Sequence, residues 1–482
     1  MAHVDVAGEI ESIRSIIGRY FPIYDVRVTH DSLSIFISPD PSTLEENFEA
    51  MRRELGSKGY IPFLRLQAGE YLIAIARKPE VKSRGPWLNL ILLIITFLTT
   101  TFAGAYLWAG YKNAETLFLA DNFLWGAIFF AVPLMTMLGM HELCHYIASK
   151  KHGVEASLPF FIPSIPPLGT FGAFISMRDP VPNRKALIDI GVAGPLGGLV
   201  VAIPLVIIGL YLTAQGEIQT GEIGTAGGMA IVLQPLYQFF MLFVPIPDNV
   251  ALHPTAFAAW VGLLVTAINL LPAGQLDGGH IARGLLGENS RYLSYVTLAV
   301  LFIMSFFYVG WFIFAVLIFM LGLRHPAPLN DISKVDNKRR FIGIAAIAIL
   351  LLTFVPIPVV EIPPDHSYEI ILVDPESPVV NVTQGEVVGF TMFVNNTGNT
   401  YLDLKFSVTQ IPMNWSAIIY LSNQSKANAT NMLEFRVPYG MSANVTMEIY
   451  VWEGATPGKR TIVLDTSSQS KSQRLSFEIN VS

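Results

Sequence analysis

Two histidines and a glutamate stand together in the sequence HELCH at residues 141–145, near the end of an apolar run. His141 and His145 are four positions apart, so on a helix both imidazoles lie on one face and can reach one ion. Glu142 projects about 100° round the helix and can reach a water held by that ion. Zinc suits this arrangement, because a catalytic zinc keeps one position for water and lowers the pKa of that water to roughly 7.

The metal-binding interpretation of this motif competes with a simpler one. In a soluble protein, H-E-x-x-H also arises by chance and then marks only an exposed helix face. This chain is 52% hydrophobic and only 14% charged, which is too apolar for an average soluble protein and predicts a membrane protein. Ionisable side chains within a membrane span cost on the order of 2 to 3 kcal/mol each and usually mark function. We therefore expect a metal site.

A site with two histidines needs a third protein ligand. Asp277, in the sequence INLLPAGQLDGGHIARG, follows an apolar segment on the same expected side of the membrane as His145. Gly278 and Gly279 would let the backbone turn there and bring the carboxylate inward. His280 is the competing candidate, and an Asp-Gly-Gly sequence can also be nothing more than a turn.

The sequence resembles the site-2 protease family of intramembrane zinc metalloproteases, peptidase family M50. The resemblance covers about residues 87–323, and it is closer to the archaeal and plastid branch than to the bacterial stress-response proteases. The segment 214–250 is too short and apolar for the PDZ domain that those bacterial members carry. The residues that carry the resemblance are HELCH at 141–145 and an N-x-x-P-x-x-x-x-D-G arrangement formed by Asn269, Pro272, Asp277 and Gly278.

The resemblance implies a ligand set and a reaction. His141, His145 and Asp277 would bind one zinc ion, and Glu142 would be the general base that moves the proton during peptide hydrolysis. The implied partners are a transmembrane protein substrate, cut in regulated intramembrane proteolysis, and the lipid bilayer. Asn269 would orient a ligand or hold the substrate backbone; alternatively, it is a buried amide that bonds a neighbouring helix carbonyl.

A short strand-like segment, GTFGAFISM at 169–177, lies among the predicted helices. A peptide bond inside a helix is shielded by the helix's own hydrogen bonds, so a protease must unwind such a substrate first. An edge strand containing Gly172, Ala173 and Phe174 could capture the extended substrate by strand addition. The alternative is a packed re-entrant hairpin. To the small residues of AGPLGG at 193–198 we assign helix packing rather than chemistry.

We expect a multi-domain membrane protein with a polytopic α-helical core. Residues 1–80 show the order helix, strand, strand, helix, strand, strand, which predicts a cytoplasmic α+β domain. Residues 81–362 form the transmembrane zinc metalloprotease domain. Residues 363–482 contain alternating strands at near-regular spacing, which predicts an extracellular all-β Ig-like sandwich.

About seven membrane crossings are expected, because several apolar runs reach the roughly 20 residues that a bilayer core requires. Residues 292–323 form either one overlong helix or two short helices broken near 308–310. Residues 229–247 contain prolines and glutamines, which leaves open whether they cross. If 292–323 is two spans and 229–247 does not cross, the flanking lysines and arginines share one side of the membrane. The remaining runs are 87–110, 123–147, 191–213, 255–271 and 342–360.

The orientation of the chain is indicated by its sequons. The N-terminus shows no signal-peptide pattern and is expected to stay in the cytoplasm. If the sequons are glycan acceptors, the tail lies outside the cell; the alternative is that a β-domain rich in Ser, Thr and Asn produces them by chance. Every Asn-x-Ser/Thr sequon lies in the tail, at Asn381, Asn395, Asn414, Asn423, Asn428, Asn444 and Asn480.

Composition also limits the competing functions. A net charge of −6 without a basic patch argues against a nucleic-acid partner, and the single cysteine, Cys144, excludes an intrachain disulfide. A second enzyme class, the multispanning H-E-x-x-H proteases that process prenylated tails, requires a downstream glutamate ligand. A third reading is a non-enzymatic receptor or adhesin whose β-sandwich binds surface glycan or protein, but the intact Glu142 argues against it.

Overall fold

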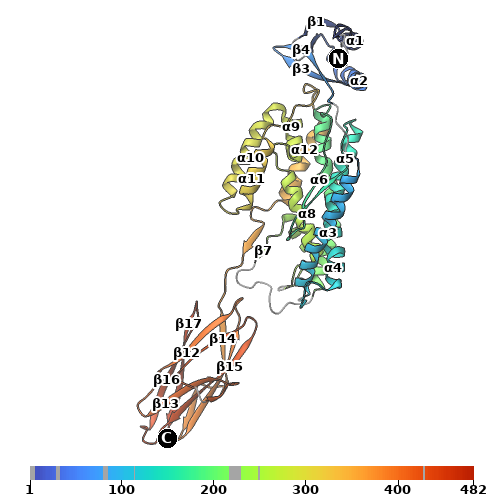
Figure 1. Cartoon of the computed structure of the whole chain (residues 1–482). Helices are drawn as coiled ribbons and strands as arrows, with labels where there is room; N and C mark the ends of the chain where they lie inside the picture. The colour runs from blue at the N-terminus through green and yellow to red at the C-terminus, as the bar shows by residue number, and fades with distance from the viewer. Residues whose placement is uncertain are drawn as a thin grey trace. The chain divides into compact units, whose positions relative to one another are not determined.

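The structure is a computed structural model and describes residues 6–28, 33–79, 85–112, 114–216, 229–247, 250–426 and 429–482. The chain gathers into two compact units, the first made mostly of residues up to 358 and the second mostly of residues 359–482. Figure 1 shows a helical region in the first unit and an all-β region in the second. This division into a helical region and an all-β tail confirms the coarse prediction from the sequence.

The N-terminal elements of the first unit follow the predicted order. They are α1 (Val6–Gly18), β1 (Ile23–Val28), β2 (Leu33–Ile37), α2 (Leu44–Ser57), β3 (Tyr60–Gln67) and β4 (Glu70–Arg77). The strands form one antiparallel sheet in the order β1-β2-β4-β3. Alternate strand residues such as Ile35 and Ile73 are fully buried, and they pack with Phe48 and Met51 of α2 in one hydrophobic core.

Backbone hydrogen bonds join this sheet to two distant segments of the same unit. The Leu64 N–H of β3 donates to the Leu329 carbonyl over 2.8 Å. The Leu329 N–H donates in turn to Val181 over 2.9 Å, and the Asn330 N–H donates to Pro182 over 2.8 Å. The side chain of Leu329 is 3% exposed and belongs to the core of the N-terminal sheet. Three segments far apart in sequence therefore share one run of strand-like pairing.

Within the described ranges, three helices are long and apolar enough to cross a membrane. The first is α3 (Trp87–Tyr111). The second runs from Ala120 to Lys151 and consists of α4 (Ala120–Gly126), a π-helical turn (Ala127–Ala131) and α5 (Val132–Lys151). The third is α6 (Arg184–Ala214). Predicted spans at 87–110, 123–147 and 191–213 lie within these helices.

The later helices are shorter. They are α7 (Pro235–Met241), α8 (Pro254–Asn269), α9 (Asp277–Leu286), α10 (Ser290–Met304), α11 (Gly310–Leu321) and α12 (Asn337–Thr353). Residues 292–323 thus form two short helices rather than one long helix. Each of these helices has fewer than the roughly 20 residues of a full span, so seven crossings stay a prediction.

Helix α6 is central to the helical region, because α5, α8 and α9 all pack against it. Figure 1 shows α5, α6 and α8 side by side. Small residues permit this proximity: a Cβ added at Gly209 of α6 would lie 2.5 Å from the Cα of Ala256 in α8. A Cβ added at Gly191 would lie 2.8 Å from the Cβ of His280 in α9. The two helices that carry the candidate ligands, α5 and α9, are thereby held by one partner.

A two-stranded hairpin lies between α5 and α6 in the sequence. Its strands are β5 (Phe160–Pro163) and β6 (Thr170–Phe174), paired antiparallel with Phe161 opposite Ala173. In the described structure this sheet has two strands, so β6 has one edge that β5 does not occupy. The strand-like segment predicted at 169–177 is thus a hairpin strand with an edge available for pairing.

The second unit contains two sheets with strand orders β10-β17-β16-β12-β14 and β13-β15-β11-β9, and a short ribbon pairs β7 (Met229–Ile231) with β8 (Val359–Glu361). Phe390 of one sheet and Phe406 of the other are fully buried in a common core. An Ig-like topology stays a prediction. The strands of the two sheets are β9 (Tyr368–Asp374), β10 (Val379–Val382), β11 (Val387–Asn396), β12 (Leu402–Gln410), β13 (Trp415–Leu421), β14 (Met432–Val437), β15 (Ser442–Val451), β16 (Gly458–Ser467) and β17 (Ser472–Val481).

Candidate metal centre

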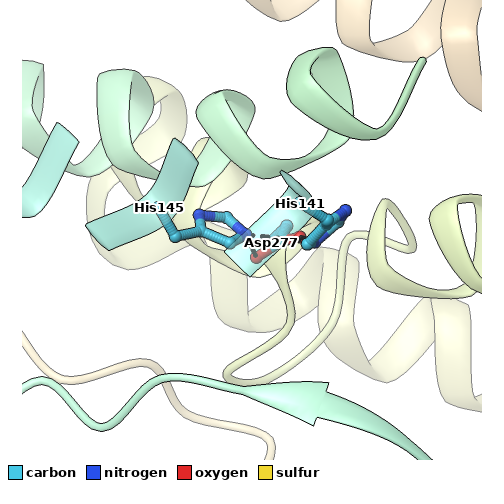
Figure 2. A group of neighbouring side chains, drawn as sticks. All are labelled: His141, His145 and Asp277. Carbon is cyan, nitrogen blue, oxygen red and sulfur yellow. Dashed lines mark hydrogen bonds and ion pairs between the residues drawn. The ribbon is translucent and has the colours of Figure 1, made fainter. Parts of the chain in front are cut away.

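Two imidazoles and one carboxylate meet near the C-terminal half of α5. His141 and His145 project from α5, and Asp277 is the first residue of α9. One ligand atom from each residue lies within 4.8 Å of the other two. Figure 2 shows the three side chains pointing toward one another. The structure therefore brings together the three residues that the sequence suggested as ligands.

The spacing of the donor atoms fits a small tetrahedral cation. The Nε2 atoms of His141 and His145 are 3.1 Å apart. Nε2 of His141 lies 3.1 Å from Oδ2 of Asp277, and Nε2 of His145 lies 3.1 Å from Oδ1 of the same carboxylate. Zinc–nitrogen bonds of about 2.0–2.1 Å at a tetrahedral angle would separate two donors by roughly 3.3 Å. The group thus has the donor types and nearly the spacing of a zinc site with three protein ligands.

The burial of these three side chains also favours a bound cation. His141 is 5% exposed and His145 is 6% exposed, and Asp277 is mostly enclosed between them. A carboxylate removed from water needs a compensating positive charge or donor. Two ring nitrogens that face both each other and a carboxylate are stabilised when a divalent cation lies between them. The arrangement therefore favours a bound metal ion.

The carbonyl of Ile190 in α6 sets the orientation of one imidazole. It lies 2.8 Å from Nδ1 of His145. A carbonyl only accepts, so Nδ1 carries the proton and Nε2 keeps its lone pair. Such a contact is the usual way in which a protein orients a metal-binding histidine. His145 is thus held in the tautomer that a ligand requires.

Glu142 lies beside the ligand group without joining it. It is 6% exposed, lines the same cavity as the three ligand candidates, and its carboxylate accepts a hydrogen bond from the Ile175 backbone N–H. Ile175 directly follows β6, so the candidate general base is linked to the end of the hairpin strand. This placement agrees with the helical offset between Glu142 and the two histidines.

The cavity has a volume of about 400 Å³ and receives several other predicted residues. Ala173 and Phe174 line it, whereas Gly172 is buried outside the lining. Asn269 also lines the cavity, and its Nδ2 lies 3.5 Å from Nε2 of His141. His280 is in the cavity wall, but its Nδ1 bonds the Leu276 carbonyl over 3.1 Å. The geometry therefore brings Asp277, and not His280, to the imidazole pair.

The glycines after Asp277 act differently from the prediction. Gly278 and Gly279 do not turn the chain, because both lie inside α9. A Cβ at Gly278 would lie 2.1 Å from the Leu270 carbonyl oxygen, and a Cβ at Gly279 would lie 2.3 Å from that of Gly274. The backbone turn is at Gly274, where φ is +52°. The Asp-Gly-Gly sequence therefore lets the start of α9 pack tightly on the preceding turn, which positions the carboxylate.

Gly194 is a part of the site that the sequence analysis did not recognise. It belongs to AGPLGG in α6, and a Cβ added there would lie 2.1 Å from Nε2 of His145 and 2.7 Å from Nε2 of His141. A Cβ at Gly197 would lie 2.3 Å from Sγ of Cys144. The motif does serve packing, as predicted, but at Gly194 the packing partners are the two candidate histidine ligands themselves. The available signal was the run of small residues itself, which indicates a close helix neighbour without identifying it.

Comparison with known proteins gives independent support. A sequence profile of peptidase family M50 matches residues 129–311, which include all three ligand candidates. The "Probable zinc metalloprotease EGY1, chloroplastic" of Arabidopsis thaliana is 30% identical over 250 residues, covering 49% of this chain and 44% of that protein. The "Probable zinc metalloprotease EGY2, chloroplastic" of the same plant is 33% identical over 239 residues, covering 47% of this chain and 41% of that protein.

The chain spans less than half the length of these two relatives. The family match nevertheless falls on the part of the chain that contains α5, α6, α8 and α9. The resemblance seen in the motifs, the matching profile and the convergence of His141, His145 and Asp277 agree with one another. Residues 129–311 of this chain are therefore similar to peptidase family M50.

Proposed function

We propose that this protein is an intramembrane zinc endopeptidase that hydrolyses peptide bonds of membrane-anchored proteins. The observation that carries the proposal is the meeting of two imidazole nitrogens and a carboxylate oxygen within 4.8 Å of one another. The histidines lie on an apolar helix long enough to span a membrane. His141, His145 and Asp277 are the proposed zinc ligands, and Glu142 is the proposed general base. The names of the plastid relatives support this assignment.

Each residue of the site has its own proposed role in hydrolysis. A zinc ion held here would polarise the scissile carbonyl and lower the pKa of a water molecule to roughly 7. Glu142 accepts a proton from the attacking water, whose oxygen forms the new bond to the carbonyl carbon. The carbon–nitrogen bond then breaks, and Glu142 returns the proton to the leaving amine. Asn269, whose Nδ2 lies 3.5 Å from Nε2 of His141, is proposed to orient His141 or to bond the substrate backbone.

Zinc analysis of purified protein tests the ligand set. We expect about one zinc ion per chain in the wild type and a loss of most of it in His141→Ala and Asp277→Ala, because each change leaves only two protein ligands. The measurement is metal content by mass spectrometry after dialysis against a weak chelator. His366→Ala, which removes an imidazole outside the ligand group, should keep the metal. Full zinc content in Asp277→Ala would contradict the proposed site.

The unwound substrate is proposed to pair with the free edge of β6, which makes β6 the docking strand. Residues 173–177 line the metal cavity in sequence, so an extended peptide paired along them would pass the ligand group. Glu142 is bonded to Ile175 in this same segment. Ala173 and Phe174 line the cavity, and Gly172, which does not, would contribute backbone alone.

Substitution of Ala173 by proline tests the docking strand. Proline removes a backbone N–H and restricts the strand. The cleavage rate should therefore fall by about tenfold or more, because the substrate loses roughly one hydrogen bond to the strand. Zinc content should be unchanged. The measurement is the cleavage rate of a fluorogenic transmembrane peptide, with Ala173→Val as the control that keeps the N–H. Equal rates in the two variants would refute this role.

The topology of the chain is also a proposal. We place the N-terminal α+β domain, residues 1–80, in the cytoplasm, seven crossings within residues 81–362, and the Ig-like domain, residues 363–482, outside the cell. The distribution of lysine and arginine around the apolar runs supports this orientation. So does the position of the sequons, since Asn381, Asn414, Asn423 and Asn444 are exposed on the β-region, while Asn428 lies outside the described residues. An external glycan or protein partner of this domain stays a prediction.

A further inference from the structure

A second cavity lies between the hairpin and α3. It has a volume of about 340 Å³ and is lined by Leu88 and Leu92 of α3, by residues 160–163 and by Phe174. Every side chain in this lining is apolar. The two leucines are four positions apart and therefore share one face of α3.

Phe174 is common to this apolar cavity and the metal cavity, because it lines both. Its side chain stacks on Phe160 with ring centroids 5.4 Å apart, yet Phe174 remains 47% exposed. Phe174 is also the last residue of β6, at the start of the segment that borders the metal centre. A group docked along that segment therefore lies next to the entrance of the apolar cavity.

Specific contacts hold the walls of the cavity in place. Nδ2 of Asn89 in α3 donates to the carbonyls of Leu158 and Pro159 over 2.8 and 3.0 Å. At the far end of the hairpin, Oγ1 of Thr99 donates to the Gly169 carbonyl over 2.6 Å. A Cβ at Gly169 would lie 2.4 Å from the Thr99 carbonyl oxygen, so the hairpin turn rests directly on α3. Helix and hairpin are thus fastened at both ends, with the cavity between them.

We propose that this cavity is a subsite for one large apolar side chain of the substrate, such as Leu, Ile, Met or Phe. The inference rests on the proposed function and specifies its substrate. A peptide extended along residues 173–177 presents alternate side chains to opposite faces. The side chain that passes Phe174 on the α3 side enters a space bounded only by apolar groups. A charged side chain there would be desolvated without a partner and is excluded.

Filling the cavity tests the subsite. Leu92→Trp places an indole in it, whereas Leu90→Trp adds the same group on the same helix at a position that is 43% exposed and outside the lining. The probes are synthetic transmembrane peptides in detergent micelles, with Phe or Ala at each position near the scissile bond. At one position the wild type should prefer Phe by about tenfold or more. The Leu92→Trp protein should lose the preference for Phe at that position and at no other position. The Leu90→Trp protein should keep it.

A binding measurement separates this inference from the proposed function. Affinities of the same peptides are measured in Glu142→Gln protein with and without Leu92→Trp, so the subsite is read even if no bond is cut. Loss of the Phe preference in the double variant supports the subsite, whereas an unchanged preference overturns it. Leu92→Ala enlarges the cavity, so with a further peptide that carries Trp at that position it should shift the preference from Phe toward Trp; this variant guards against misfolding of the tryptophan variant. If Leu92→Trp displaces co-purified lipid without changing peptide preference, the cavity is a lipid site and the inference fails.

Discussion

Gly194→Ala is expected to abolish metal binding and, with it, cleavage. The added methyl group would lie 2.1 Å from Nε2 of His145 and 2.7 Å from Nε2 of His141, far inside any permitted contact. Neither imidazole can move aside without losing its place in the ligand group, and His145 is also fixed through Nδ1 to the Ile190 carbonyl over 2.8 Å. Separation of α5 from α6 is the remaining response, and it would disrupt a closely packed interface.

The measurement is zinc content together with the cleavage rate of the transmembrane peptide. Zinc should fall to near the background level, and the rate should fall by about a thousandfold or more, because the metal supplies several kcal/mol of transition-state stabilisation. Gly198→Ala is the matched control in the same motif, since its Cβ would come no closer than 3.4 Å to Nδ1 of His141. A Gly194→Ala protein that keeps both zinc and activity would show that the two helices are not so closely apposed.

Glu142→Gln is expected to lower the cleavage rate by about 10²–10⁴-fold while zinc content stays at the wild-type level. The amide has the size of the carboxylate, and its oxygen can still accept from the Ile175 N–H, so the local structure should persist. What the amide cannot do is take a proton from water. The variant therefore removes the proposed general base and leaves His141, His145 and Asp277 in place.

Zinc analysis and single-turnover cleavage of the fluorogenic peptide measure this effect. Peptide affinity should change little, because Glu142 is proposed to act on the proton rather than on substrate binding. Glu142→Asp, which keeps the carboxylate one methylene shorter, should recover part of the rate. Wild-type turnover in the glutamine variant would remove Glu142 from the mechanism, and loss of zinc would instead make it a structural residue of the site.

The local motif was more predictable from the sequence than its surroundings. The four-residue spacing of His141 and His145 has only one outcome on a helix, namely a shared face. The position of Asp277 was harder to predict, because its approach to α5 depends on the close contact of α9 with α6 at Gly191. Periodicity does not encode such a contact between elements. Asp277 was favoured over His280 partly by its position after an apolar segment on the same expected side as His145, and partly by the resemblance to the family.

The predictions from the sequence that were wrong or incomplete concern glycine residues. In sequence, a glycine that frees the backbone looks the same as a glycine that admits a neighbour. Gly278 and Gly279 were assigned to a turn but are required by contact with backbone carbonyls, while the turn is at Gly274. Gly194 was assigned to general helix packing, yet its neighbours are the Nε2 atoms of the two proposed histidine ligands. In both cases the missing information was the identity of the opposing atoms.

The number of crossings shows another limit of sequence analysis. Hydropathy identified the three long apolar helices because each exceeds the thickness of a bilayer core. It could not decide between one helix and two over residues 292–323, since both have the same composition. The structure separates α10 from α11 there.

The main-chain pairing of Leu64, Leu329 and Val181 has an evolutionary consequence. Amide and carbonyl groups are common to almost every residue type, so this junction places little demand on the identity of the side chains beyond an apolar residue at 329. Homologous proteins could diverge widely at these positions and still keep the same joint. Sequence divergence here would therefore be a poor guide to whether a homologue retains the N-terminal module in the same place.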